Sequence, residues 1–347
     1  MPSLLETRLR NQGLTGRPRT SASAIVARLG AVQAQDYHGA AWALSLRSRD
    51  LTLADVDRAL AAGEIIRTHV LRPTWHLVAP ADLRWMLALT GPRVKRLMRT
   101  YDARLELDAD TYSRARRVFE RALAGGRYLT RAELAAALAA AGVVASSTRL
   151  AHLVMDAELN AVICSGPRRG SHGTYALVDE HVPATTALAR DEALAALATR
   201  FFRSHGPAAV QDFGWWSGLT MGDARTAIAL ASLHTEVLAS PPSADRAADA
   251  HYLLPNYDEY FIAYRHRNAV LDPARSRNYG VFASTEYPHQ VVLHGRVAGS
   301  WRREVGRDRA EVTVRAYARP TATEKRALAK AADRFGRFLG VPCILKH

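Results

Sequence analysis

The sequence is poor in cysteine, with only Cys164 and Cys343 among its 347 residues. Two cysteines so far apart, with no neighbouring partner, argue against a disulfide framework and against a cysteine-based zinc site. The thirteen histidines are scattered, so we expect no bound metal and no other cofactor. We find no signal peptide and no run of 18 apolar residues, which predicts a soluble, cytoplasmic protein without a membrane span.

The motifs of several common enzyme classes are also missing. We find no Walker A loop, no Gly-x-Gly-x-x-Gly, no Gly-x-Ser-x-Gly and no His-Glu-x-x-His. His234-Thr-Glu236 fits the His-x-Glu of zinc deaminases, but Pro342-Cys343 lacks the second cysteine that their zinc requires. These absences exclude the familiar phosphate-loop, serine-hydrolase and zinc-dependent reactions.

Acidic residues are outnumbered by basic ones, 33 to 47, which gives a net charge of +14 and a pI of about 10.3. Nearly all of the excess is arginine, and such a balance favours a polyanionic partner such as nucleic acid. The alternative is that the charges reflect coding bias and only solvate the surface. Because 48% of the residues are apolar, the whole chain is expected to be globular.

The pattern of apolar residues, caps and breakers predicts an α+β protein of three tandem winged-helix units and a small C-terminal β-barrel-like domain. We expect the units at 1–100, 101–184 and 185–240 and the barrel-like domain, closed by a helix over 324–339, at 241–347. In the first unit, short helices and the capping box of Thr52 and Asp55 precede two strands within 65–78, joined by a turn at Arg72-Pro73. A helix from Pro80 is expected to end near Gly91.

The second unit has the clearest local pattern. Helices over 112–123 and 132–141, and a third from Ser146 or Ser147, precede two strands around a basic, glycine-rich loop over 166–173. In a winged helix, the third helix enters the major groove, so we expect Arg149 to point outward with Thr148 and His152. Arg168 and Arg169 would meet phosphates. The alternative is a winged helix that serves only as a spacer or interaction module.

The remaining segments give weaker patterns. Helices are expected over 187–202, 209–216 and 221–233, with Trp215 and Trp216 placed in the core rather than stacked on bases. Strands follow from His251 onward, and His294-Gly295 suits a hairpin turn.

Two glutamines one residue apart, Gln33 and Gln35, lie beside Asp36 between the glycine breaks at Gly30 and Gly39. Taken alone, this is a polar loop that could simply bond its own backbone. Taken as a site, two amides can position a water but cannot deprotonate it near neutral pH. Asp36 is then the alternative base.

Four segments together resemble the winged-helix DNA glycosylases of the AlkZ/YcaQ type, over nearly the whole chain. They are Val32-Gln-Ala-Gln-Asp-Tyr37, Trp42-Ala-Leu-x-Leu-Arg47, Arg67-Thr-His-Val-Leu-Arg-Pro-Thr-Trp-His-Leu-Val78 and Leu254-Pro-x-Tyr-Asp-Glu-Tyr260. The resemblance implies tandem winged helices, a C-terminal β-barrel, and excision of bulky N7-alkylated purines, including interstrand crosslinks, from double-stranded DNA. It makes Gln33 and Gln35 the catalytic pair, in the Gln-x-Gln form associated with self-resistance to DNA-alkylating natural products.

Further residues are assigned with this resemblance in view. His69, Arg72, Thr74 and His76 would lie near the lesion, Asp258 and Glu259 are taken as mainly structural, and four arginines are candidate phosphate contacts. These four are Arg275, Arg277, Arg302 and Arg303. Because Lys95 is the first lysine, no Schiff-base nucleophile is expected near the glutamines, which predicts a monofunctional enzyme. Separately, we expect a monomer without obligate protein partners. The rival hypothesis is a non-catalytic winged-helix transcriptional regulator, which would dimerise on a palindromic sequence.

Overall fold

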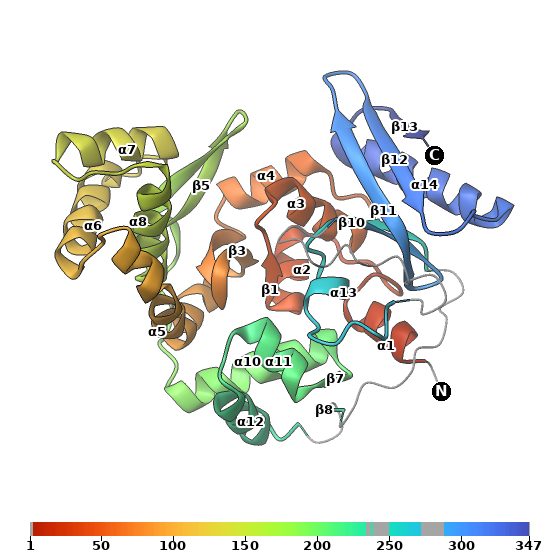
Figure 1. Cartoon of the computed structure of the whole chain (residues 1–347), viewed down its shortest axis with the longest axis horizontal. Helices are drawn as coiled ribbons and strands as arrows, with labels where there is room; N and C mark the ends of the chain where they lie inside the picture. The colour runs from red at the N-terminus through yellow and green to blue at the C-terminus, as the bar shows by residue number, and fades with distance from the viewer. Residues whose placement is uncertain (1–2, 234–236, 239–249, 272–287, 347) are drawn as a thin grey trace.

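Two arms rise from a central body (Figure 1). The computed structural model describes residues 3–233, 237–238, 250–271 and 288–346. In the view of Figure 1, one arm is formed by residues of the second unit and the other by the C-terminal sheet, with the N-terminal unit between them. Within the described part, no helix is both long and apolar enough to cross a membrane.

The N-terminal unit combines four helices with a three-stranded antiparallel sheet of order β1-β3-β2. Its strand β1 was not expected, and the turn between β2 and β3 lies at Leu71 (φ 64°) rather than at Arg72-Pro73, which belongs to β3. The capping box of Thr52 and Asp55 is confirmed. The elements are α1 (Leu4–Asn11), α2 (Ala22–Leu29), β1 (Ala31–Gln33), α3 (Tyr37–Leu46), α4 (Leu53–Ala61), β2 (Ile66–Val70) and β3 (Arg72–Val78).

Helix α5 (Pro80–Arg104) is far longer than expected, because it continues through Gly91-Pro92 instead of ending there. The glycine serves a close approach: a Cβ on Gly91 would lie 3.1 Å from the carbonyl oxygen of Leu159. Pro92 has no backbone N–H, so the helix loses one hydrogen bond at this position. Packing of α5 against the next unit offsets this loss. The helix therefore links the first two units.

The second unit has its own apolar core and the expected three helices and hairpin. The capping box at Thr130 and Glu133 is present, and β5 and β6 pair antiparallel beside the short β4. Contrary to the expectation, His152 is buried, where it pairs with Asp102. The elements are α6 (Ala109–Leu123), β4 (Leu129–Thr130), α7 (Arg131–Ala140), α8 (Ser147–Leu159), β5 (Ile163–Arg169), β6 (His172–Leu177) and α9 (Val178–His181).

The third group of helices packs under the first unit. Trp216 is fully buried as expected, whereas Trp215 is 39% exposed and donates to the carbonyl of Ile262. The strands here are two residues long and parallel, so the described residues of this region form no antiparallel wing. The elements are α10 (Arg190–His205), β7 (Ala208–Ala209), α11 (Val210–Ser217), α12 (Met221–Leu230) and β8 (Val237–Leu238).

The C-terminal sheet is open, which corrects the expectation of a barrel-like domain. Its order is β13-β12-β11-β10-β9, and in the described residues the two edge strands do not pair. Helix α14 fills the face that a barrel would enclose, with Phe335 against Trp42 and Trp301. The hairpin turn at His294-Gly295 is confirmed by positive φ at both residues. The elements are β9 (Tyr252–Leu254), α13 (Glu259–Ile262), β10 (His289–Leu293), β11 (Arg296–Val305), β12 (Ala310–Ala316), α14 (Ala322–Leu339) and β13 (Cys343–Lys346).

Candidate active site

Gln33 is held on both its backbone and its side chain. It ends β1 opposite His76 of β3, and it is only 6% exposed. Its N–H donates to Glu259 Oε1 at 2.9 Å, and its side-chain oxygen accepts from Arg72 Nη2 at 2.8 Å. The amide is therefore fixed in orientation before any substrate arrives.

Gln35 is exposed, and its side chain makes no hydrogen bond to a described residue. Ala34, between the two glutamines, continues the pairing with β3, since its N–H donates to the carbonyl of Trp75 at 2.7 Å. The chain then bends at Gln35, just before α3. One glutamine of the pair is thus anchored and its neighbour is free to meet a ligand.

Asp36 is occupied at both carboxylate oxygens. Oδ1 accepts from the N–H of Gly39 at 3.0 Å and so caps α3, while Oδ2 pairs with Arg303 Nη2 of β11 at 2.7 Å. Gly39 is required by this cap, since a Cβ there would lie 2.8 Å from Oδ2. These bonds leave Asp36 poorly placed to act as a base.

Glu259, which the sequence analysis took as mainly structural, contacts Gln33 directly. Besides Gln33, it accepts from Trp216 Nε1 at 3.0 Å and lies 3.3 Å from His205 Nε2, and all three side chains are fully buried. Its neighbour Asp258 is structural as expected, in a bidentate pair with Arg47 at 2.8 and 2.9 Å. The only signal in the sequence was an acid pair inside an aromatic segment.

The other residues expected near the lesion lie mostly below the surface. His69 is buried and bonds Glu158 of α8 through Nδ1. His76 is fully buried, and desolvation holds its pKa well below the ordinary value, so it is neutral. Its Nδ1 donates to the carbonyl of Thr74 at 3.0 Å, whereas Nε2 has no hydrogen-bond partner among the described residues, and neither has Thr74 Oγ1. Arg72 alone among these touches a glutamine side chain.

The two arms each bring one of the expected arginines to the glutamine segment. Arg168 of the β5–β6 hairpin lies 4.6 Å from the ring centre of Tyr37, and Arg303 of β11 pairs with Asp36. Burial lowers the pKa of His38, and the positive charges of Arg168 and Arg303 lower it further. Both arms therefore converge on residues 35–38.

The remaining arginine candidates are placed differently. Arg149 donates to carbonyl groups of its own unit, including that of Val144 at 3.0 Å, and Arg169 pairs with Glu133. Arg302 is exposed beside Arg303. Arg275 and Arg277 lie outside the described residues.

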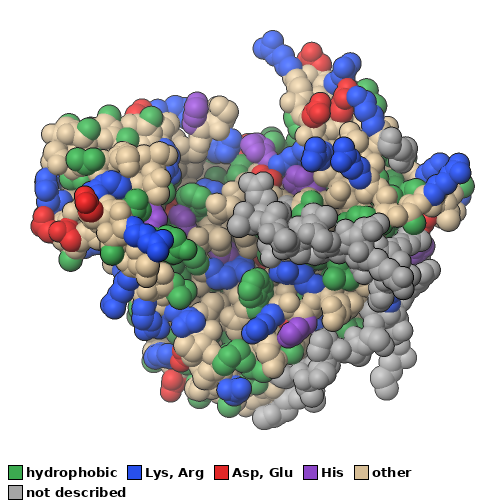
Figure 2. All heavy atoms as spheres, in the orientation of Figure 1, with side chains coloured by type: hydrophobic (Ala, Val, Ile, Leu, Met, Phe, Trp, Pro, Cys, Tyr) green, Lys and Arg blue, Asp and Glu red, His purple; other side chains and the backbone are tan. Residues whose placement is uncertain are grey.

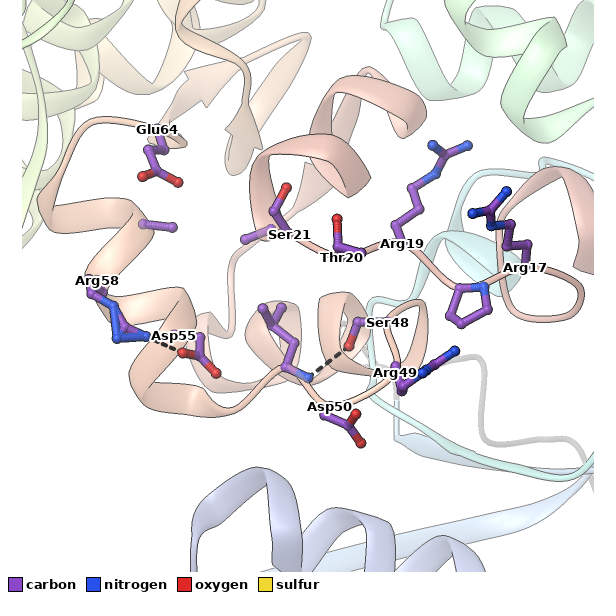
Figure 3. A pocket seen from close by; sticks show the side chains of 14 residues that line it. Arg17, Arg19, Thr20, Ser21, Ser48, Arg49, Asp50, Asp55, Arg58 and Glu64 are labelled. Atoms are coloured by element: carbon purple, nitrogen blue, oxygen red, sulfur yellow. Dashed lines mark hydrogen bonds and ion pairs between the residues drawn. The ribbon is translucent and has the colours of Figure 1, made fainter.

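The space-filling view shows a hollow between the two arms, with Arg, Lys and His side chains gathered over its floor (Figure 2). A different pocket, of about 600 Å³, lies between the α1–α2 and α3–α4 connections and contains neither glutamine. Arg17, Arg19 and Arg49 lie along one side of it and Asp55, Arg58 and Glu64 along the other (Figure 3). Because Asp55 is engaged by Arg58 and by its capping box, this pocket offers no convergent chemistry.

Within the described part of the chain, no three His, Cys, Asp or Glu side chains gather where they could hold a metal ion. The site is therefore built from amides, arginines, buried acids and aromatic rings.

Comparison with known proteins gives concordant matches. A family model described as DNA glycosylase AlkZ-like matches residues 26–338. An interstrand DNA cross-link repair glycosylase of Streptomyces sahachiroi is 26% identical over 330 residues, which cover 85% of each chain. The solved structure of the Streptomyces sahachiroi DNA glycosylase AlkZ superposes with a TM-score of 0.75 at 22% identity, over 99% of this chain and 98% of that one.

Proposed function

Because the chain belongs to the AlkZ-like family of DNA glycosylases, we propose that it excises bulky N7-alkylated purines from double-stranded DNA, with Gln33 and Gln35 as its catalytic residues. The name of the Streptomyces sahachiroi relative, an interstrand cross-link repair glycosylase, supports crosslinked purines as further substrates. The observation that carries the proposal is the pairing of an anchored glutamine with an exposed one, where both arms converge.

The chemistry of the substrate suits two amides. An N7-alkylated guanine is already cationic, so its glycosidic bond breaks toward an oxocarbenium ion without a strong general acid. The enzyme must place a water and stabilise positive charge at the sugar, which is a task for preorganised dipoles. A carbonyl oxygen has two acceptor positions, so Gln33 can bind Arg72 and a water together. Gln35 supplies the second, unengaged amide.

Among the described residues, none at the site is well placed to deprotonate that water. A glutamine does not titrate, and Asp36 uses both oxygens within the protein. His76 has an unpaired Nε2, but burial holds its pKa well below the ordinary value, so this nitrogen is a poor proton acceptor. The proposed step is thus attack by a positioned water on a sugar that already carries positive charge, with proton loss to solvent afterwards.

Covalent catalysis through a lysine has no candidate among the residues around the glutamines. Lys95, the first lysine in the chain, lies on α5, where its Nζ donates to Asn160 Oδ1 at 2.6 Å. We therefore propose a monofunctional enzyme that acts as a monomer and leaves an abasic site without cutting the strand.

A duplex with one N7-alkylguanine tests this function. We expect enzyme-dependent release of the modified base and strand breaks only after alkali or heat. Breaks without that treatment would contradict the monofunctional mechanism. If the protein releases no base from small or bulky N7 adducts and binds one palindrome tightly, the regulator becomes the better hypothesis.

A further inference from the structure

A pocket of about 290 Å³ opens between the β5–β6 hairpin of the second unit and the first unit. Its wall includes Tyr37, which follows the glutamine segment directly. Around it lie Arg67, Trp75, Arg131, Arg168 and Tyr175. The pocket is therefore shared by two units and borders the proposed catalytic residues.

Arg67 ties this pocket to the glutamines. Its Nε donates to the carbonyl of Ala34, the residue between Gln33 and Gln35, at 3.1 Å. Its guanidinium carbon lies 4.6 Å from the ring centre of Trp75. A guanidinium has five N–H donors, and the other four of Arg67 make no hydrogen bond to a described residue.

Two further arginines face the same space. Arg168 stacks over Tyr37, and its Nη2 donates to the carbonyl of Ser171 at 2.9 Å. Arg131 interacts with the hydroxyl of Tyr175. Burial lowers the pKa of Arg67, the negative charge of Glu158 raises it, and the positive charge of Arg168 lowers it again.

No carboxylate lines the pocket in the described residues. The nearest acids have other partners: Glu158 bonds His69 and Trp75, and Asp57 accepts from the Tyr37 hydroxyl at 2.5 Å while lying 3.7 Å from Arg168 Nε. Three arginines thus face two nearby carboxylates, so the pocket keeps a net positive charge that an entering anion would balance.

We propose that this pocket binds a single phosphodiester group of the DNA strand near the lesion, which rests on the proposed function only in taking DNA as the ligand. Phosphate fits better than an aromatic part of an adduct, because Arg67 and Arg168 already cover faces of Trp75 and Tyr37. Forked guanidinium donors match phosphate oxygens. Through Arg67 and Ala34, the bound phosphate would also hold the segment between the glutamines.

Salt dependence provides the first test. The full-length double variant Arg131→Gln/Arg168→Gln changes two arginines at the rim and leaves the half-buried Arg67 in place. Its matched control, Arg117→Gln/Arg121→Gln, removes the same charge from exposed positions on α6, at the outer side of that arm (Figure 1). On undamaged duplex, we expect the slope of log K against log salt to become shallower by about 0.9 in the pocket variant, the value for one phosphate. The control should keep the wild-type slope.

A loss of about 1.8, the value for two independent phosphates, or no change in slope, would overturn a shared single-phosphate site. Equal midpoint temperatures of thermal unfolding for the two variants would show that their folds are comparable. The binding slope needs no excision, so failure of the pocket and failure of the glycosylase proposal give different results.

Uncharged phosphates provide the second test. A duplex with one abasic-site analogue fixes the register, and a methylphosphonate then replaces each phosphate in turn. We expect the methylphosphonate at one position near the analogue to weaken binding by the wild type about tenfold. The same substitution should leave binding by the pocket variant unchanged. If wild type and variant show the same penalties at every position, the assignment is wrong.

Discussion

At the scale of single residues, the two glutamines differ in how firmly the protein holds them. Gln33 is anchored by Glu259 and Arg72, whereas Gln35 has no hydrogen bond to a described residue. Their identity as candidates could be predicted from the sequence through a motif. The anchoring could not, because Glu259 lies 226 positions away and meets Gln33 only in the folded chain.

Glu259→Gln tests the anchor. In the wild type, Glu259 accepts hydrogen bonds from the Gln33 N–H and from Trp216 Nε1. A glutamine at position 259 must turn its NH2 group toward one of these two donors, so one of the hydrogen bonds is lost. We expect stability to fall by about 1–3 kcal/mol. We expect base release at saturating enzyme to fall on the order of 10²-fold, with DNA affinity unchanged, because a small displacement of Gln33 is enough to misplace the water.

Asp82→Asn is the matched control for this variant, since Asp82 is also buried and accepts from a tryptophan and an arginine but makes no hydrogen bond to Gln33. It should lose a similar amount of stability and keep its single-turnover rate. Equal loss of rate in both variants would show that Glu259 acts through stability alone.

At the scale of helices and strands, the features that could be predicted were those set by residues close together in the sequence. The capping boxes at Thr52 and Thr130 and the turn at His294-Gly295 depend on residues a few positions apart. Strand β1 and the full length of α5 depend instead on distant partners, namely β3 and the carbonyl of Leu159. The barrel expectation failed for a similar reason, because closure would require the edge strands β9 and β13 to pair across a long stretch of chain, and in the described residues they do not pair.

The fully buried pair of Arg47 and Asp258 fixes the end of α3 against the start of α13. Arg47→Met leaves Asp258 buried without its partner, so we expect a loss of about 3–5 kcal/mol in urea unfolding. Arg58→Met, which breaks the exposed pair with Asp55, should change stability by less than about 1 kcal/mol. Similar losses in both variants would contradict this account of the buried pair.

His289 of β10 gives the fold a predictable response to acid. Burial lowers its pKa to about 4, and the charge of Arg303 adds to the effect. The folded pKa is below the unfolded value of about 6.5, so the unfolded chain binds the proton first as pH falls. Stability should therefore decline between about pH 6.5 and pH 4, by on the order of 2 kcal/mol from this residue.

His289→Gln should recover that part of the decline when urea unfolding is compared at neutral and acid pH. If the variant loses as much stability in acid as the wild type, the loss is due to other groups, such as His76.

At the scale of the whole molecule, function depends on how the units face one another. The sequence predicted helices, hairpins and a basic surface, but not the contacts that set the arms: Glu158 on His69 and Trp75, and Arg303 on Asp36. Such contacts join residues far apart in the chain, so no local pattern encodes them. They explain why Arg168 and Arg303 reach the glutamine segment while Arg149 and Arg169 bond within their own unit.

The most direct measurement is single-turnover release of modified base from an oligonucleotide with one N7-alkylguanine, for wild type and for Gln33→Ala/Gln35→Ala. The account predicts that the wild type releases the base and that the double variant, with wild-type thermal unfolding and DNA affinity, is slower by at least about 10²-fold. An unchanged rate in the double variant would contradict the assignment of these two glutamines as the catalytic residues.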